Sequence, residues 1–555
     1  MLYTRSLSQL ESTFPALTLT HVCSRWRDIA LSNPSFWSRM ELRVQLENAT
    51  DKSISAALFI IELCLARSGQ SPLDLVIEFT DIFFQRDETF DLTEELYQIC
   101  FGFLPIYRIF FDQAHRWRNA HLFLPRNFFG PRWYLNADWP EYFPILEELA
   151  VHIIGYSDDC IGTLPSIKIS APRLHTLTHT GYGVAIVSSV GDTPPGDGSS
   201  VANADSSNKS SFDSLRSLTF SQSLHQYELC LASPLTTVTM RRISGFTYSG
   251  SEKTTCLARN IVILPETDRD WTLQSTLDYM TCPNLASFSL EIPITQFPSL
   301  ALVPQESSSN FGHNGRGLSI EPVSEPSTDN MYYEKLADLL VRGNAANITH
   351  FSIINIRLKD DHIIHILSRL PSLSHLALAD TVFRDYSDPG DHYAGAYNEA
   401  ESAETERQWR RQGSPLMLSR SLFNSLSFCD GDSPSYDPVT YDPLLHLTEL
   451  HVGFSRGQGR GGIFALLDMV QSRTRKPVSP GLQFVRIKLV SDWNSDCSDF
   501  ELYYESEEHL HLEEEIGEVV KERLDQLGEV GIAVELEWAD TLREWRAGLG
   551  CWKID

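Results

Sequence analysis

One glycine-rich run has the spacing of a phosphate-binding loop. Gly457–Gly462 reads GQGRGG and matches GxGxxG, in which the glycines let the backbone approach the pyrophosphate of a dinucleotide. It follows a predicted strand and precedes a predicted helix. In a dinucleotide-binding fold an acidic residue ends the next strand, about 20 residues after the glycines. The first candidate here, Asp492, lies 30 residues beyond Gly462 and is therefore too far along the chain. A cofactor-binding enzyme is therefore kept only as a third alternative, and a turn between repeats fits the run better.

Two histidines have the spacing of metal ligands. His362 and His365 lie beside Asp360 and Asp361. The sequence supplies no well-placed third ligand, and aspartates near a helix N-terminus are explained by the helix dipole. The ten cysteines contain no CxxC pair, and no G-x-S-x-G, H-E-x-x-H, P-loop or kinase motif occurs. We therefore expect a non-enzyme with no cofactor and no metal.

The composition excludes several classes of partner. The chain has 555 residues, of which 45 are Lys or Arg and 73 are Asp or Glu, so its formal net charge is −28. Such an acidic protein is a poor candidate for binding nucleic acid or an anionic membrane. No apolar run reaches the ~20 residues of a membrane span, no secretion signal is present, and the scattered cysteines suit reduced thiols. We expect a cytoplasmic or nuclear protein.

A short apolar pattern recurs along the chain, with apolar residues at i, i+3 and i+5. The last two alternate and point to one face of a short strand, and the first lies in the turn that feeds it. This is the core of a leucine-rich repeat. The copies are Leu146/Leu149/Val151, Leu215/Leu218/Phe220, Leu235/Val238/Met240, Leu285/Phe288/Leu290, Ile348/Phe351/Ile353, Leu373/Leu376/Leu378, Phe423/Leu426/Phe428, Leu447/Leu450/Val452 and Leu482/Val485/Ile487. A further copy, Leu174/Leu177, places His179 at the third position.

Helical segments separate several of these strands. Apolar spacing predicts helices at 332–342, 361–369, 462–473, 515–527 and 54–68, the last ended by Gly69 before a strand at Leu73–Phe79. The alternation indicates a parallel α/β array. Motif starts lie 20 to 63 residues apart, whereas regular repeats keep about 20–29, so the array is irregular. An ordinary α/β domain whose strands only resemble the motif is the alternative.

Four polar stretches interrupt the array. Residues 187–212, 303–330, 381–415 and 491–515 are rich in Ser, Gly, Asp, Glu or Pro and cannot bury enough apolar surface to order on their own, so we predict disordered insertions. Residues 492–518 hold eleven acidic side chains. They are predicted to form a solvated loop or, alternatively, a patch that captures a basic partner segment.

The most distinctive local pattern in the sequence is residues 15–37, PALTLTHVCSRWRDIALSNPSFW. Leu19, Val22 and Trp26 fall on one face of a single predicted helix. The helix should end before Pro34, since the residue before a proline disfavours helical geometry. Two tryptophans and a phenylalanine within twelve residues give this small unit a dense apolar content.

This segment resembles the second half of an F-box, the helical module that binds the Skp-family adaptor of cullin–RING ubiquitin ligases. The segment VCSRWRDIALSNPSFW is similar to the corresponding segment of the F-box-like proteins that are numerous in mushroom-forming fungi. The helix–strand unit at 61–79 and the His115-Arg116-Trp117 element are similar to later segments of the same proteins. The resemblance implies that adaptor binding uses Leu17, Leu19, Val22, Cys23, Trp26, Ile29, Pro34 and Trp37.

The first half of the F-box is missing, because residues 1–14 contain neither the Leu-Pro start nor the acidic-isoleucine pair. We expect an α/β fold in which a partial F-box-like helical module, residues 1–45, precedes an irregular leucine-rich-repeat solenoid of parallel strands alternating with helices, residues 46–555. The resemblance implies a non-catalytic substrate-recognition subunit of a Skp–cullin–F-box type ubiquitin ligase. Its repeats would bind an unidentified target protein, and the adaptor would connect it to a cullin. The alternative is a protein-interaction scaffold with a degenerate F-box that does not bind the adaptor.

Overall fold

The computed structural model of the chain describes its repeat elements. The described residues are 10–44, 50–79, 101–125, 139–154, 166–181, 185–188, 212–221, 231, 233–241, 253–265, 271–291, 329–356, 358–380, 418–427, 444–455, 459–474, 481–490 and 519–539. The chain divides into two compact units, Met1–Val262 and Ile263–Asp555.

The first unit is a β-sheet with helices between its early strands. Its elements are β1 (Leu10–Thr13), α2 (Pro15–Val22), α3 (Ser24–Ser32), η2 (Pro34–Trp37), β2 (Arg39–Val44), α4 (Asp51–Ser68), β3 (Leu73–Phe79), α6 (Leu104–Phe111), η4 (Ala114–Arg116), β4 (Trp117–Pro125), β5 (Glu148–Ile154), β6 (Ser166–Ile169), β7 (Thr176–Thr180), β8 (Ala185–Ser188), β9 (Ser217–Phe220), β10 (Thr237–Arg241) and β11 (Thr254–Thr255), with β12 (Asn260–Leu264) at the boundary. The strand order is β1-β2-β3-β4-β5-β7-β9-β10, and β6 pairs with β8 separately. β1 and β2 are antiparallel, whereas β2 to β5, β7, β9 and β10 pair in parallel.

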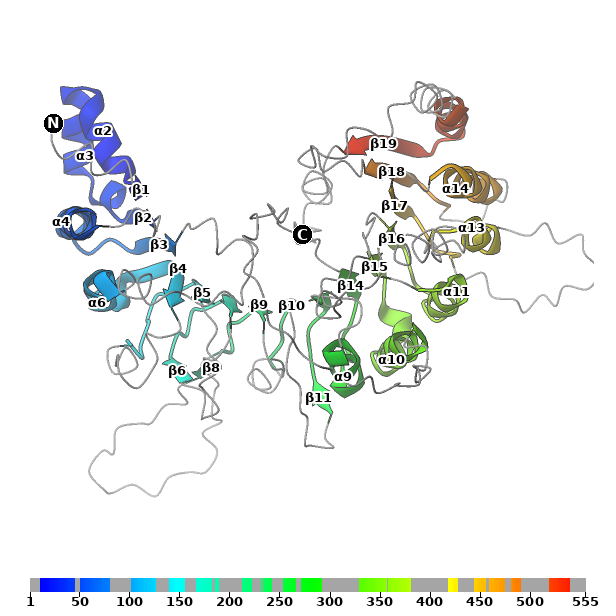
Figure 1. Cartoon of the computed structure of the whole chain (residues 1–555), viewed down its shortest axis with the longest axis horizontal. Helices are drawn as coiled ribbons and strands as arrows, with labels where there is room; N and C mark the ends of the chain where they lie inside the picture. The colour runs from blue at the N-terminus through cyan, green and yellow to red at the C-terminus, as the bar shows by residue number, and fades with distance from the viewer. Residues whose placement is uncertain are drawn as a thin grey trace, which may run out of the picture. The chain divides into compact units, whose positions relative to one another are not determined.

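The second unit repeats strand and helix in sequence. Its elements are α9 (Trp271–Tyr279), β13 (Met280–Thr281), β14 (Ser287–Glu291), α10 (Asp329–Arg342), η7 (Ala345–Asn347), β15 (His350–Ile354), α11 (Asp360–Ser368), β16 (His375–Asp380), α13 (Arg420–Leu426), β17 (Glu449–Ser455), α14 (Gly459–Thr474), β18 (Phe484–Val490) and β19 (Ala533–Ala539). Strands β14 to β19 are neighbours in chain order and pair in parallel. Helices α10, α11, α13 and α14 lie along one side of these strands (Figure 1).

Parallel pairing in register stacks the apolar motif positions into rows. In the second unit Phe288, Phe351, Leu376, Leu450 and Val485 are successive Cα partners, and all five side chains are buried. Full burial of one such side chain stabilises the fold by about 1.5–3 kcal/mol. The predicted α/β fold of parallel strands alternating with helices is confirmed, and its repeats form a leucine-rich-repeat-like solenoid.

The repeat with a histidine at its third position is a strand like the others. His179 of β7 lies between Val151 and Phe220 in the register and is fully buried. The imidazole therefore occupies a core position that apolar side chains fill in the neighbouring repeats.

One predicted strand is wrong. Phe423 and Leu426 lie in helix α13, and Phe428 falls outside the described residues. The Ser419 hydroxyl accepts a hydrogen bond from Leu422 N (3.1 Å) and caps this helix at its start. Apolar spacing of three residues is shared by a helix face and by the first two motif positions, so the pattern alone did not separate the two structures.

The predicted helices and the neighbouring strand are otherwise confirmed. Residues 332–342, 361–369 and 462–473 correspond to α10, α11 and α14, and a helix at 519–529 covers most of the predicted 515–527. The segment 54–68 lies within α4, and Gly69 follows with φ 56°, a value that favours glycine. Strand β3 has the predicted bounds.

The four predicted insertions lie almost entirely outside the described residues. They overlap the described part only at the end of β8, at residue 212 and at the start of α10. Within the predicted helical module at 1–45, the structure adds strands β1 and β2 to the helices α2, α3 and η2.

A buried arginine joins two consecutive repeats of the first unit. Arg116 donates through Nη2 to Ser68 Oγ (2.7 Å) and Ser71 O (2.9 Å), and through Nη1 to Gln113 Oε1 (2.9 Å). Trp117 follows in the core, and its indole N–H donates to Phe110 O (3.1 Å). The His115-Arg116-Trp117 element thus has a structural role, because it ties the turn after α4 to the start of β4.

Among the helices that the structure describes, none is both long enough and apolar enough to cross a bilayer. Of the four cysteines in the described residues, all of them free thiols, Cys64, Cys256 and Cys282 are buried and Cys23 is exposed. Burial raises the pKa of the Cys64 thiol to about 12.

The stacked rows predict a site-dependent cost for removing apolar side chains. Leu376→Ala should lower the free energy of unfolding by about 2–5 kcal/mol, because it leaves a cavity in a buried row. Leu445→Ala, at a 40% exposed leucine, should change it by less than about 0.5 kcal/mol. Urea unfolding followed by circular dichroism measures both. Equal losses in the two variants would contradict the assignment of Leu376 to the core.

Candidate functional site

The N-terminal segment forms two short helices where the sequence predicts one. Cys23 breaks the helix with an extended backbone (φ −160°, ψ 172°). Arg27 of α3 donates through Nε to Thr20 O (2.9 Å) and so satisfies a carbonyl at the end of α2. The Thr20 hydroxyl itself donates to Leu17 O (2.7 Å). Residues 20–23 are Thr, His, Val and Cys, all of low helix propensity, which accounts for the break.

The inner side of this helix pair is anchored by Trp37. The Trp37 side chain is 2% exposed, and its indole N–H donates to Ala30 O (2.6 Å) across the turn that follows α3. Asn33 ends α3, and its side chain accepts hydrogen bonds from the backbone N–H (3.2 Å) and hydroxyl (2.8 Å) of Ser35. Trp37 therefore fixes α3 against η2 from within.

The helix pair also exposes large apolar side chains. Val22 is 61% exposed, Trp26 44% and Ile29 38%, and Leu31 is also exposed. Leu31 lies about 200° around α3 from Ile29, so we call only Val22, Trp26 and Ile29 the N-terminal apolar face. A single exposed apolar residue needs no explanation, but four within ten residues of one small helix pair are typical of an interaction site.

Most of the eight residues predicted to bind an adaptor are accessible. Val22, Cys23, Trp26, Ile29 and Pro34 are exposed, Leu17 and Leu19 are half-buried, and Trp37 is buried. The structure thus brings the predicted residues into the helix pair and the following η2 but turns Trp37 inward, where it supports the helix pair without being part of its surface.

The glycine-rich run has a packing role at its last position. Helix α14 begins at Gly459, and residues 456–458 lie outside the described part of the chain. A Cβ on Gly462 would lie 2.8 Å from Leu418 O and 3.0 Å from the Phe454 ring, so only glycine lets α14 approach this closely. This contact explains Gly462 without a nucleotide.

The two predicted metal-spaced histidines pack against an aromatic ring. His362 stacks on Tyr333 with centroids 4.1 Å apart and an interplanar angle of 5°, and His365 meets the same ring edge-on at 5.5 Å. Within the described ranges, no group of three or more His, Cys, Asp or Glu residues is placed to hold a metal ion.

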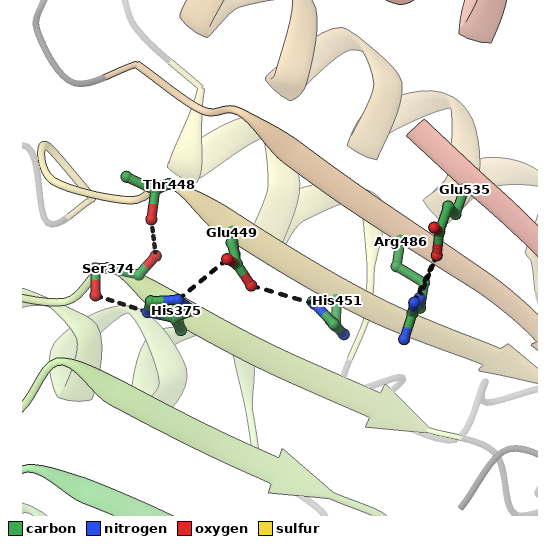
Figure 2. A network of polar contacts seen from close by, with 7 residues as sticks. All are labelled: Ser374, His375, Thr448, Glu449, His451, Arg486 and Glu535. Atoms are coloured by element: carbon green, nitrogen blue, oxygen red, sulfur yellow. Dashed lines mark hydrogen bonds and ion pairs between the residues drawn. The ribbon is translucent and has the colours of Figure 1, made fainter. Parts of the chain in front are cut away.

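A polar network that the sequence did not predict lies on the second unit. Because Leu376 and Leu450 point into the core, the alternate residues of β16 and β17 point to the opposite side of the sheet. Figure 2 shows the centre of this network on strands β16 to β19. We call the following residues the strand face: His350, His375, Glu449, His451, Phe484, Arg486 and Glu535.

Hydroxyl side chains just before the strands connect successive repeats. Thr448 Oγ1 donates to Ser374 O (3.0 Å), Ser374 Oγ to Thr349 O (3.1 Å), and Thr349 Oγ1 to Ala286 O (3.3 Å). Each of these carbonyls also accepts backbone N–H groups of the next repeat. The same residue position in each repeat thus fixes where the following strand begins.

The carboxylate of Glu449 is held between two imidazoles. His375 Nε2 lies 3.2 Å from Glu449 Oε1, and His451 Nε2 lies 3.9 Å from Oε2 (Figure 2). The other nitrogen of His375 contacts Ser374 Oγ at 2.7 Å. His350 stacks on His375 with centroids 3.9 Å apart and an interplanar angle of 10°. Glu449 thus lies beside this row of imidazoles while its side chain keeps 36% exposure.

The next two strands carry a second carboxylate. Arg486 donates to Glu535 Oε2 through Nε (2.8 Å) and Nη2 (2.6 Å), and its guanidinium lies 5.5 Å from the centroid of the Phe484 ring. The Glu535 side chain is 48% exposed and that of Arg486 22%. This arrangement offers hydrogen-bond acceptors and aromatic rings to a bound partner.

A signal for this face was present in the sequence. His350, His375 and Glu449 each stand directly before the second motif residue, and His451 directly after it. Their shared position in the repeat places them on one side of the sheet once the strands are in register. Which strands are neighbours, and so which side chains meet, did not follow from the motif alone.

Two comparisons with known proteins gave no match. No family model matches the chain, and no curated protein matches it. The functional proposal below therefore depends on the residues and their geometry.

Several histidines of the two units resist protonation. Burial, with a smaller effect from His152, lowers the pKa of His179 to about 3. Burial is also the main cause that lowers the pKa of His152 to about 4, with His121 and Arg241 adding to it. Burial and the adjacent His375 lower the pKa of His350 to about 4. These side chains are neutral in the folded protein at neutral pH.

These lowered pKa values predict destabilisation by acid. Between pH 6.5 and the folded-state pKa, an unfolded histidine binds a proton that the folded one does not, so stability is complete above about pH 6.5 and falls as the pH decreases. For His179 alone, the loss between pH 7.5 and pH 5 should be about 2 kcal/mol. His179→Leu should reduce the dependence of the free energy of unfolding on pH by this amount. Urea unfolding at several pH values measures it.

The control is His175→Gln in the same repeat, because this imidazole is exposed. It should leave the pH dependence as in the unmodified protein. An unchanged slope in His179→Leu would contradict a neutral buried imidazole at that position.

Proposed function

We propose that the chain is a non-catalytic substrate-recognition subunit of a Skp–cullin–F-box type ubiquitin ligase. The helix pair α2–α3 binds the Skp-family adaptor, the adaptor connects to a cullin, and the repeats hold a target protein. The observation that carries this proposal is the N-terminal apolar face. It coincides with the segment whose sequence resembles an F-box, and it includes Val22, Trp26 and Ile29 from the expected adaptor-binding set.

The geometry supports a partner for this face. Beneath it Trp37 and Ala30 are buried and joined by the indole hydrogen bond to Ala30 O, whereas Trp26 stays 44% exposed. Covering apolar surface is favourable by about 25 cal/mol per Å², and a partly exposed tryptophan among aliphatic neighbours is a frequent anchor of binding energy. A partner with an apolar groove would therefore gain binding energy here without unfolding the helix pair.

A protein-interaction scaffold with a degenerate F-box is the second candidate. It is favoured by the buried position of Trp37, which is what a helical cap on the first strands of a solenoid requires. In that case the helix pair protects the sheet and binds no adaptor. The two candidates differ in the role of Trp26, which matters to binding in the first and is dispensable in the second.

The proposal predicts that adaptor binding depends on Trp26. The full chain should bind purified Skp-family adaptor, and Trp26→Ala should weaken binding by about 2–4 kcal/mol, as expected for truncation of a tryptophan anchor. Isothermal titration calorimetry measures the affinity, and circular dichroism verifies that the variant is folded.

The matched control is Phe59→Ala on α4, which removes another exposed aromatic side chain, 62% exposed, from outside the helix pair. It should bind the adaptor as the unmodified chain does. If the folded, unmodified chain does not bind the adaptor at all, the ligase proposal is wrong and the scaffold becomes the better interpretation.

A further inference from the structure

The acidic character of the chain is concentrated in the second unit. Residues 263–555 contain 46 Asp or Glu and 24 Lys or Arg, so this unit accounts for most of the net charge of −28. An excess of this size produces a negative potential that attracts cationic partners and accelerates their association. A surface of this unit that binds another protein is therefore suited to a basic segment.

On the strand face, the charge that solvent reaches is mainly negative. The side chains of Glu449 and Glu535 are 36% and 48% exposed. The basic residues are less accessible, since Arg486 is 22% exposed and engaged with Glu535, and Lys488 is buried. An incoming cation thus meets the carboxylates first.

The Glu535 carboxylate is oriented before any partner arrives, because Arg486 donates two hydrogen bonds to it. The Glu449 carboxylate lies 3.2 Å from His375 Nε2. Preorganised acceptors lose little side-chain freedom on binding, so more of the interaction energy appears as affinity. Each carboxylate also keeps exposed surface, which leaves room for a further donor.

Aromatic rings lie beside the carboxylates. The stacked pair His350 and His375 adjoins Glu449, and Phe484 lies next to it in the strand register. The guanidinium of Arg486 already lies over the Phe484 ring. Arg486 thus already combines a carboxylate with an aromatic ring within this face, and a lysine or arginine from a partner would meet Glu449 beside the imidazole rings.

We propose that the strand face binds a Lys/Arg-rich segment of the target protein, whose cationic side chains contact Glu449 and Glu535. This deepens the proposed function and rests on it in one respect, that the bound protein is the ligase target. Binding of a basic segment itself does not depend on adaptor binding.

The test uses the full chain and two fluorescent peptides of equal length, one rich in Arg and Lys and one with Glu at the same positions. Fluorescence anisotropy measures their affinities at low and at physiological salt. The basic peptide should bind and the acidic peptide should not. The double variant Glu449→Gln/Glu535→Gln should bind the basic peptide about fivefold more weakly, a loss expected for two partly exposed ion pairs.

The matched control is Asp338→Asn, which removes an exposed acidic charge from helix α10 of the same unit. It should change the affinity by less than about twofold, because a remote exposed charge is largely screened by salt. Circular dichroism and thermal unfolding verify the fold of each variant. If the double variant does not fold, Glu535→Gln on the last strand alone should still weaken binding more than the control does.

Three results would overturn the proposal: no binding of the basic peptide, equal affinities of the double variant and the control, or tighter binding of the acidic peptide. Adaptor affinity, measured on the same preparations, separates this proposal from the ligase function. Strand-face variants that lose the peptide but keep the adaptor support both. If the unmodified chain binds the basic peptide but not the adaptor, only the ligase assignment is contradicted.

Discussion

Each strand of the second unit begins at a position set by the repeat before it. A backbone carbonyl, such as that of Ser374, accepts two backbone N–H groups and the hydroxyl of Thr448 from the next repeat. The same pattern at Thr349 and Ser374 aligns β15 with β16. Because side chains alternate along a strand, a slip of one residue would place the leucines in solvent and the histidines in the core. The buried rows and the strand face therefore both follow from this one alignment.

The N-terminal helix pair is held together by a different kind of contact from the strands. It is held by side-chain contacts to backbone carbonyls, with Trp37 bound to Ala30 and Arg27 to Thr20. These contacts satisfy carbonyl groups at Thr20 and Ala30, while Trp26 remains partly exposed on α3. The contacts that hold the helix pair thus come from Trp37 and Arg27, and a substitution of Trp26 leaves both in place.

The sequence predicted the parts of the fold that repeat locally, and not those that depend on distant neighbours. Strand β3 matches its expected bounds because apolar alternation and Gly69 mark it within the chain itself. Phe423 was misassigned to a strand because its spacing also suits a helix. The contact between His375 and Glu449 requires the register of two strands far apart in sequence. The inward direction of Trp37 goes with its hydrogen bond to Ala30 O, which the sequence pattern did not indicate.

The hydrogen bonds that these hydroxyl side chains make do not depend on how many residues separate the two repeats. Ser374 and Thr349 are 25 residues apart, whereas Thr448 and Ser374 are 74 apart, yet the hydrogen bonds are alike. Tripling the length of a connection costs only about 1 kcal/mol of closure entropy. Evolution can thus lengthen one connection without disturbing the neighbouring repeats. Divergence in such a lineage would accumulate as uneven repeat lengths, while the geometry of the strands is inherited unchanged.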